Sequence, residues 1–168
     1  MRIFYRYAAL LCITALLTAC GTTQPKRHSA SYKKPPANLT VGQGPNRALA
    51  VYALKLIGTP YYFGGSSPEQ GFDCSGLIQY STKKSLNLNA PRTAAEQSAW
   101  GRNISLADIK AGDLVFFETS GQRISHSGIY LGDDFFVHAP SSGGVVRVDS
   151  LKNPYWQPRI RIIRRIQP

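Results

Sequence analysis

Residues 114–139 read LVFFETSGQRISHSGIYLGDDFFVHA, and this stretch decides the fold class. Short runs enriched in aromatic and β-branched residues predict strands, and the Gly132-Asp133-Asp134 sequence predicts a tight turn between two of them. Working outward, the same pattern predicts two further strands toward the C-terminus, the last with alternating Arg and Ile. The five predicted strands lie at 114–117, 127–131, 135–139, 145–148 and 159–166.

Helices are expected before these strands. A largely apolar segment predicts a helix over 47–57, with Asn46 as its N-cap. A second helix is predicted over 74–86 after the capping residue Asp73, and Thr93-Ala94-Ala95-Glu96 is a capping box that begins a third, short helix. Helices followed by strands indicate an α+β domain, with the helices packed on an antiparallel sheet of about five strands.

The N-terminus has the features of an export signal over residues 1–19. Arg2 and Arg6 precede an apolar run from Ala8 to Leu17, which is shorter than the roughly 20 residues that span a bilayer. The run ends in Leu17-Thr18-Ala19-Cys20, which resembles a bacterial lipobox, so we expect Cys20 to be lipidated and to begin the mature chain. The alternative is an ordinary signal peptide cut near Ala19. Because Gly21 rather than Asp follows, we expect an outer-membrane anchor facing the periplasm.

Residues 20–45 are predicted to be a flexible basic linker, and residues 46–168 the folded domain. The chain has a formal net charge of +11 at pH 7, and the linker holds basic residues without an acid. Beside a lipidated terminus, these charges favour anionic lipid or anionic wall polymer, although they could serve only to solvate the linker. Nucleic acid is not an expected partner, because an exported chain does not meet it.

Cys74 is the candidate nucleophile. The chain has three cysteines; Cys12 is lost with the signal and Cys20 is lipidated, so Cys74 remains as a thiol. Exported proteins usually pair or avoid cysteines, which marks this one as reactive rather than as an inert buried thiol. At the start of a helix, backbone N–H groups are expected to lower the thiol pKa and to bind an oxyanion, and Gly76 leaves room for substrate.

Two histidines are the candidate partners of this thiol. His126 and His138 are 12 residues apart and flank the predicted turn, so a hairpin centred near Gly132 would place them opposite each other at about 5 Å. One ring would then accept the thiol proton while the other orients it. His28 lies in the linker and has no predicted role.

A zinc site made by Cys74, His126 and His138 is the alternative use of these residues. Their spacing lacks a Cys-x-x-Cys or His-x-x-x-His pair, and a helix N-terminus suits an anion better than a cation. We therefore expect no metal and no cofactor.

Several sequence blocks, taken together, resemble the NlpC/P60 family of cell-wall cysteine peptidases over residues 47–166. The blocks are Gly58-Thr59-Pro60-Tyr61-Tyr62-Phe63-Gly64-Gly65, Phe72-Asp73-Cys74-Ser75-Gly76, Pro91-Arg92-Thr93 with Gln97, Ala111-Gly112-Asp113-Leu114-Val115-Phe116-Phe117, His126-Ser127-Gly128-Ile129-Tyr130, Phe136-Val137-His138-Ala139 and Asn153-Pro154-Tyr155-Trp156. The resemblance implies a papain-like α+β fold with Cys74 as nucleophile, His126 as base and His138 as the third polar residue.

The resemblance also implies a tyrosine whose hydroxyl faces the reaction centre, which is assigned to Tyr61, with Tyr62 as the second choice. Around the nucleophile, Asp73, Ser75 and Arg92 are the candidate substrate-binding residues. Asp73 is expected chiefly to cap the helix and Ser75 to act through its backbone. Arg92 is expected either to meet a substrate carboxylate or to pair with an acid.

One residue departs from the family pattern. Ser127 follows the base where the family more often has an apolar side chain. On the opposite face of its strand from His126, it is expected to tune activity rather than abolish it.

The implied activity is that of a murein endopeptidase. The family hydrolyses peptide bonds that involve D-Glu or D-Ala and diaminopimelate, within peptidoglycan stem peptides or their cross-links. The expected partners are therefore stem peptides and, through lipidated Cys20, the membrane. The alternatives are a catalytically silent wall-binding lipoprotein and a lipid acyltransferase with a related Cys-His site.

Overall fold

The computed structural model describes residues 36–121, 123–142 and 144–166. The predicted signal segment, Cys20 and most of the predicted linker lie outside these residues. Within the described ranges, no helix has both the length and the apolar character needed to cross a membrane.

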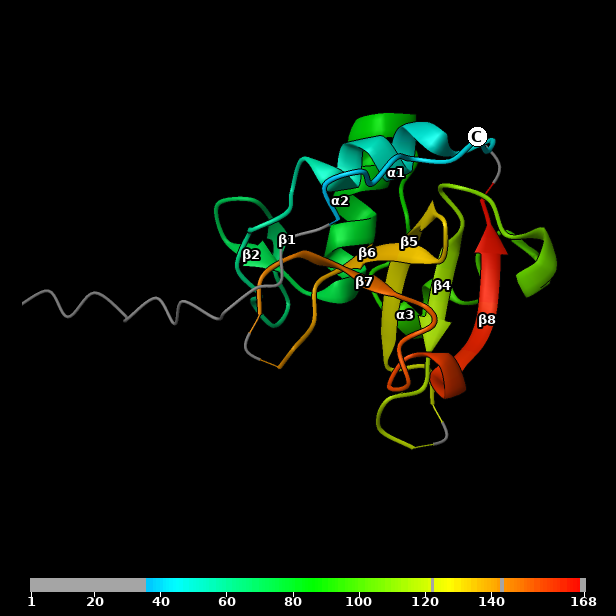
Figure 1. Ribbon diagram of the computed structural model, residues 1–168. Coiled ribbons are helices and arrows are strands. Elements are labelled where there is room, and N and C mark those ends of the chain that lie inside the picture. The colour runs from blue at the N-terminus through cyan, green and yellow to red at the C-terminus, as the bar shows by residue number, and fades with distance from the viewer. Residues whose placement is uncertain (1–35, 122, 143, 167–168) are drawn as a thin grey trace, which may run out of the picture.

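An antiparallel sheet forms the centre of the domain (Figure 1). Its strands are β3 (Arg102–Asn103), β4 (Leu114–Phe117), β5 (His126–Gly132), β6 (Phe135–His138), β7 (Arg147–Ser150) and β8 (Ile160–Arg165). They are ordered β3-β8-β4-β5-β6-β7, and every residue of β4 and β5 is buried. Two short strands, β1 (Ser66–Ser67) and β2 (Gly71–Phe72), form a separate antiparallel pair.

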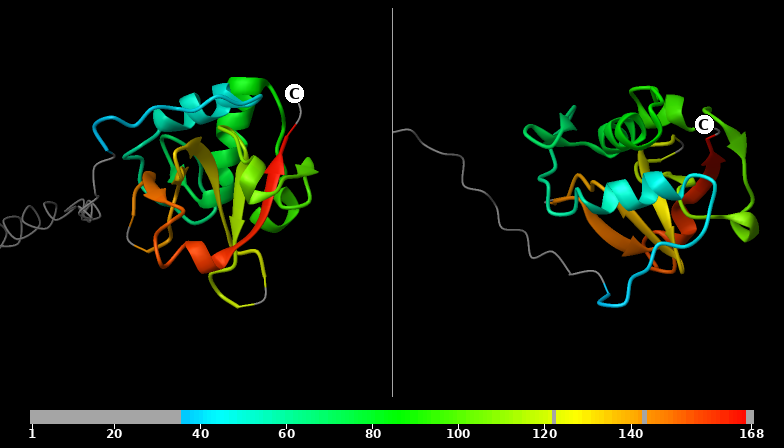
Figure 2. Two further views of the ribbon diagram at one scale, coloured as in Figure 1. Left: turned by 45° about the vertical axis from the view of Figure 1, so that its right-hand side comes forward. Right: turned by 90° about the horizontal axis from the view of Figure 1, so that it is seen from above.

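Two helices cover one face of this sheet (Figures 1 and 2). They are α1 (Arg47–Leu54) and α2 (Cys74–Leu86); a short α3 (Ala94–Gln97) and two 3-10 turns, η1 (Leu106–Asp108) and η2 (Gln157–Arg159), complete the elements. Apolar side chains from both helices, among them Leu49 and Leu77, pack with Ile129 of β5 into the main core. A smaller cluster around Phe117, Phe136 and Trp156 covers the other face.

The predicted helices agree well with the observed ones. The prediction of α2 is confirmed at both ends, and the capping box of Thr93 and Glu96 at the start of α3 is present. The first helix ends at Leu54, earlier than predicted. Asn46 precedes it without a side-chain cap: its Nδ2 donates to the Ile166 carbonyl at 2.6 Å, and its Oδ1 has no hydrogen-bond partner among the described residues.

The predicted strands need three corrections. The strand predicted over 145–148 is observed as β7, two residues later, because Val145 forms an isolated bridge with Pro60. The short edge strand β3 and the pair β1–β2 were not predicted. The third correction concerns register: a bulge between Tyr130 and Gly132 pairs Ile129 with Val137, and continuing this register sets His138 opposite Gly128 rather than His126.

The packed part of the chain begins earlier than the predicted boundary at Asn46. Leu39 and Val41 pack against the main core, and the Gly42 N–H donates to the Leu131 carbonyl at 2.8 Å. The Gln43 carbonyl accepts from the Ala111 N–H. The last residues of the predicted linker therefore belong to the folded unit.

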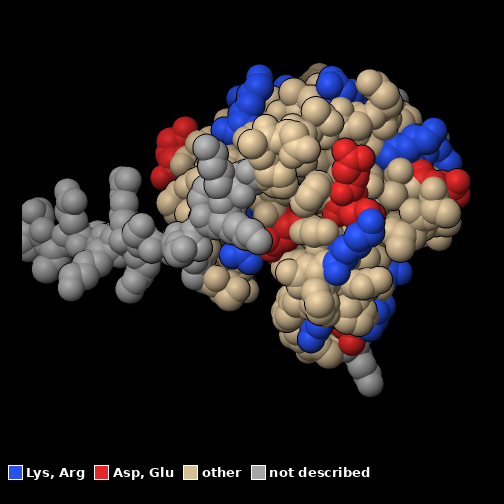
Figure 3. Space-filling view, viewed as in Figure 1, with Lys and Arg blue, Asp and Glu red and all other residues tan. Residues whose placement is uncertain are grey.

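Acidic and basic side chains are interspersed on the face shown in Figure 3. On this face, the excess of positive charge in the sequence does not gather into one continuous basic surface.

Candidate active site

Cys74 begins α2, and its neighbour Asp73 holds this end of the helix in place. The Asp73 carboxylate accepts from the Gly76 N–H at 2.6 Å, which confirms its role as N-cap, and from the Gly64 N–H at 3.0 Å. A Cβ on Gly76 would lie 2.0 Å from the Gly65 carbonyl oxygen. The absence of a side chain there makes room for the loop at 61–65 beside Cys74, and not for substrate as expected.

The expected lowering of the Cys74 pKa is wrong for this resting structure. Burial raises the pKa of the thiol above its ordinary value of 9.0, and the Asp73 carboxylate raises it further. The hydroxyl and backbone of Ser127 and the backbone of Ser75 act in the opposite direction but do not prevail. Helix-end N–H groups stabilise a thiolate, but here the cost of desolvating the charge is larger.

Tyr61, and not Tyr62, lies beside the nucleophile. The Tyr61 side chain lines the same pocket as Cys74, and its pKa is raised by burial and then by the charge of a Cys74 thiolate. Tyr62 is 52% exposed and does not line this pocket. A raised pKa keeps the Tyr61 hydroxyl protonated and able to donate a hydrogen bond.

Arg92 pairs with an acid, which is one of the two uses expected for it. It donates to Asp73 at 2.7 and 3.2 Å and to the Ser75 hydroxyl at 2.9 Å. Burial alone would raise the pKa of Asp73, but the hydrogen bonds from Arg92 and Gly76 hold it below its ordinary value. The three predicted substrate-binding residues are thus bonded to one another at the edge of the Cys74 pocket.

The two candidate histidines form a direct hydrogen bond. His126 Nε2 lies 2.8 Å from His138 Nδ1, although the rings come from diagonal rather than opposite positions. Both rings are buried, and burial is the main cause that lowers the pKa of each. The missing side chain of Gly128 leaves room for the His138 side chain, since a Cβ there would lie 3.3 Å from the His138 Cβ.

Two residues at this site were not predicted from the sequence. Asp149 of β7 lies 2.9 Å from His138 Nε2. Trp156 stacks on the His126 ring at 5.2 Å between centroids, and its indole N–H donates to Asp149 at 3.1 Å. The block at 153–156 was the available signal for Trp156. Nothing local in the sequence indicates which residue Asp149 would contact.

Ser127 connects the two halves of the site. It follows His126 in β5, is fully buried and lies next to the Cys74 sulfur, whose pKa it lowers. Its hydroxyl oxygen has no hydrogen-bond partner among the described residues. No hydrogen bond in the described part of the chain joins Cys74 to His126 directly; such contacts often tighten only when substrate binds.

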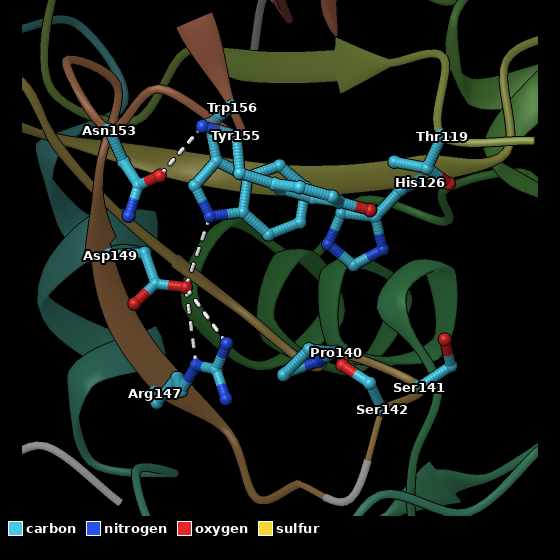
Figure 4. Close-up of a pocket in the computed structure, with 10 residues that line it drawn as sticks. All are labelled: Thr119, His126, Pro140, Ser141, Ser142, Arg147, Asp149, Asn153, Tyr155 and Trp156. Atoms are coloured by element: carbon cyan, nitrogen blue, oxygen red, sulfur yellow. Dashed lines mark hydrogen bonds and ion pairs between the residues drawn. The ribbon is translucent and has the colours of Figure 1, made fainter.

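Two pockets lie at the start of β5. One contains Cys74, Tyr61, the exposed Phe63 and the loop residues Ile124 and Ser125. The other contains His126 (Figure 4). It is lined by Thr119, His126, Pro140, Ser141, Ser142, Arg147, Asp149, Asn153, Tyr155 and Trp156.

The described residues contain no group of three or more His, Cys, Asp and Glu side chains arranged to hold a metal ion. His126 and His138 are hydrogen-bonded to each other, and His138 is also hydrogen-bonded to Asp149.

A comparison with known families matches residues 58–165 to the NlpC/P60 family. The chain belongs to this family. A probable endopeptidase of Haemophilus influenzae is 38% identical over 95% of this chain and 98% of its own length. The murein DD-endopeptidase/LD-carboxypeptidase MepS of Escherichia coli is 39% identical over 65% of this chain, which spans 56% of that protein.

A solved peptidoglycan hydrolase has the same fold. The peptidoglycan hydrolase RipB of Mycobacterium tuberculosis superposes with a TM-score of 0.61 at 28% identity, over 72% of this chain and 64% of that one. The predicted papain-like α+β fold with an antiparallel sheet is thereby confirmed.

Proposed function

We propose that this NlpC/P60 protein is a murein endopeptidase that uses Cys74 to hydrolyse peptide bonds in peptidoglycan stem peptides or cross-links. The proposal depends mainly on one arrangement. The Cys74 thiol at the start of α2 lies next to Ser127 of β5. The residue before Ser127, His126, is hydrogen-bonded to a second buried histidine, His138. The names of the relatives, two endopeptidases and one peptidoglycan hydrolase, support the same class of substrate.

In the first step, the Cys74 thiol transfers its proton to Nδ1 of His126 while the sulfur attacks the scissile carbonyl carbon. The oxyanion forms beside the N-terminus of α2, where backbone N–H groups are available. The Tyr61 hydroxyl, kept protonated by its raised pKa, is a second donor at this position.

In the second step, His126 returns the proton to the leaving nitrogen as the C–N bond breaks, which leaves a thioester on Cys74. Water then attacks the thioester, His126 accepts the water proton, and the thiol is regenerated as the acid product leaves. The pocket in Figure 4 borders His126, so we assign it to the amine-bearing half of the substrate. The Cys74 pocket then holds the acyl half.

Measuring the products tests this function. Full-length protein is incubated with purified peptidoglycan, and the released muropeptides are weighed by mass spectrometry beside a sample whose thiol is blocked with iodoacetamide. We expect stems or cross-linked dimers to shorten only with the unblocked protein, and the product masses name the bond. Binding to sacculi without any cleavage by the folded, reduced protein would contradict the proposal and favour a wall-binding role. Transfer of an acyl chain to or from lipid would favour the acyltransferase.

We also propose that the protein is anchored through lipidated Cys20 and faces the periplasm from the outer membrane. The support is the sequence around Cys20 and Gly21. Labelled palmitate should enter the wild-type chain and not Cys20→Ser, and membrane fractionation should recover the labelled chain in the outer membrane. Equal labelling of both chains, or none, would exclude the anchor, and recovery in the inner membrane would exclude the location.

A further inference from the structure

Asp149 ends a buried chain of hydrogen bonds that starts at His126. His126 Nε2 and His138 Nδ1 are 2.8 Å apart, and His138 Nε2 and Asp149 Oδ2 are 2.9 Å apart. His138 is completely buried and the Asp149 side chain is 20% exposed. His126 therefore uses one ring nitrogen, and His138 uses both, in hydrogen bonds to neighbouring side chains.

The direction of these bonds follows from the charge of Asp149. An ionised carboxylate only accepts, so the proton of His138 must sit on Nε2. Its Nδ1 then carries a lone pair and accepts from Nε2–H of His126. Because a neutral imidazole has one proton, Nδ1 of His126 is left as the base.

Three further contacts hold the Asp149 carboxylate in this orientation. Arg147 donates to Asp149 Oδ2 from Nε at 3.2 Å and from Nη2 at 3.1 Å, and the Trp156 indole N–H donates to the same oxygen at 3.1 Å (Figure 4). The Trp156 ring also stacks on His126. One side chain thus touches both ends of the hydrogen-bond chain.

The carboxylate stays charged at working pH. Burial would raise its pKa, but the contacts with His138, Arg147 and Trp156 lower it to about 2. The charged or titratable groups that act on His138 are Asp149 and Arg147 of β7, with His126 of β5 bonded to its other nitrogen.

We infer that Asp149 is a positioning residue that fixes, through His138, which ring nitrogen of His126 carries the proton. This inference rests on the proposed role of His126 as the base. Asp149 does not need to touch substrate for this role. It acts on the reaction indirectly, by fixing the orientation and the proton position of the His138 ring and, through it, of the His126 ring.

Nitrogen-15 NMR of the histidine rings in the full-length protein at neutral pH reads these proton positions without any turnover. We expect His126 and His138 both to be neutral and protonated on Nε2. In Asp149→Leu, which has a similar volume but no acceptor, both rings should move to a mixture of tautomers. Asp149→Asn keeps an acceptor oxygen and should retain more of the wild-type pattern.

Kinetics on purified muropeptides supply the second readout. Loss of a residue that orients a metal-ligating histidine typically costs about 10- to 100-fold, and we take the same size for Asp149, which orients a catalytic histidine through a second ring. We expect a loss of that size in kcat for Asp149→Leu, with a smaller change in KM, and a partial recovery in Asp149→Asn. Asp134→Asn, which removes a carboxylate paired with Lys152 on the surface, is the matched control and should leave kcat unchanged.

Two results would overturn the inference. One is a wild-type spectrum in which His138 carries its proton on Nδ1. This result does not depend on whether any variant folds. The other is a folded Asp149→Leu chain with both rings still protonated on Nε2 and kcat within twofold of wild type. If the wild type cleaves no peptidoglycan, the proposed function fails, while the nitrogen spectra still decide the role of Asp149.

Discussion

At the scale of single residues, the site rests in a neutral state. Burial raises the pKa of the Cys74 thiol and lowers that of the His126 imidazole, so neither group is charged near pH 7. Proton transfer must then accompany attack, or follow the arrival of substrate. Ser127 is the side chain best placed to ease this step, because its hydroxyl favours the thiolate.

Removing the Ser127 hydroxyl should make the thiolate harder to form. In Ser127→Ala, the pH midpoint for alkylation of Cys74 by iodoacetamide should move to higher pH than in wild type. Mass spectrometry of the Cys74 peptide follows the reaction. Ser81→Ala is the matched control. Ser81 is also a fully buried serine whose hydroxyl has no hydrogen-bond partner among the described residues, but it lies two turns of α2 away from Cys74. An unchanged or lower midpoint in Ser127→Ala would contradict the assignment.

At the scale of elements, the β5–β6 hairpin sets the distance between the two histidines. The bulge near Leu131 moves His138 opposite Gly128, and the missing side chain at Gly128 lets the His138 ring reach diagonally toward His126. Diagonal neighbours in an antiparallel pair are within reach of such side chains.

Filling that space should disturb both fold and site. A Cβ on Gly128 would lie 2.6 Å from a ring carbon of Phe136 and 3.0 Å from the Val137 carbonyl oxygen. Overpacking of this kind costs about 1–3 kcal/mol, which urea unfolding followed by circular dichroism would measure for Gly128→Ala. Gly42→Ala is the control, because its Cβ would meet its nearest atoms at 3.5 Å, an ordinary contact. Equal stability of the two variants would count against this packing argument.

The sequence predicts most elements because their signals are local. The cap at Asp73, the capping box at Thr93 and the apolar runs of β4 to β6 each lie within a few residues. The bulge, the short strand β3 and the contact of Asp149 with His138 depend on residues far apart or on register, which no local pattern carries. The prediction for the Cys74 pKa was wrong for the same reason. The position of Cys74 at a helix start can be read from neighbouring residues, but its burial depends on residues far away in the sequence.

At the scale of the whole molecule, Asp149 links stability to pH. Its pKa is lowered from 3.8 to about 2 in the folded protein. A depressed folded pKa stabilises the fold at pH values above the unfolded pKa, and this contribution is lost as pH falls from about 4 to about 2. The difference corresponds to about 2 kcal/mol.

Asp149→Asn should therefore flatten the acid limb of the stability curve. Urea unfolding between pH 2 and 6 should show that the wild type loses about 2 kcal/mol more than the variant on acidification. Asp134→Asn, at a more exposed ion pair, should follow the wild-type curve closely. Parallel curves for the wild type and Asp149→Asn would mean that the contacts with His138, Arg147 and Trp156 do not lower the pKa of Asp149.

The most direct test of the central claim is the initial rate at which Cys74→Ala cleaves purified muropeptides, measured beside the wild type by mass spectrometry. Because the sulfur forms the covalent intermediate, the account predicts a loss of at least about a thousandfold, with the circular dichroism spectrum unchanged. A folded Cys74→Ala chain that keeps more than about a tenth of the wild-type rate would contradict the assignment of Cys74 as nucleophile.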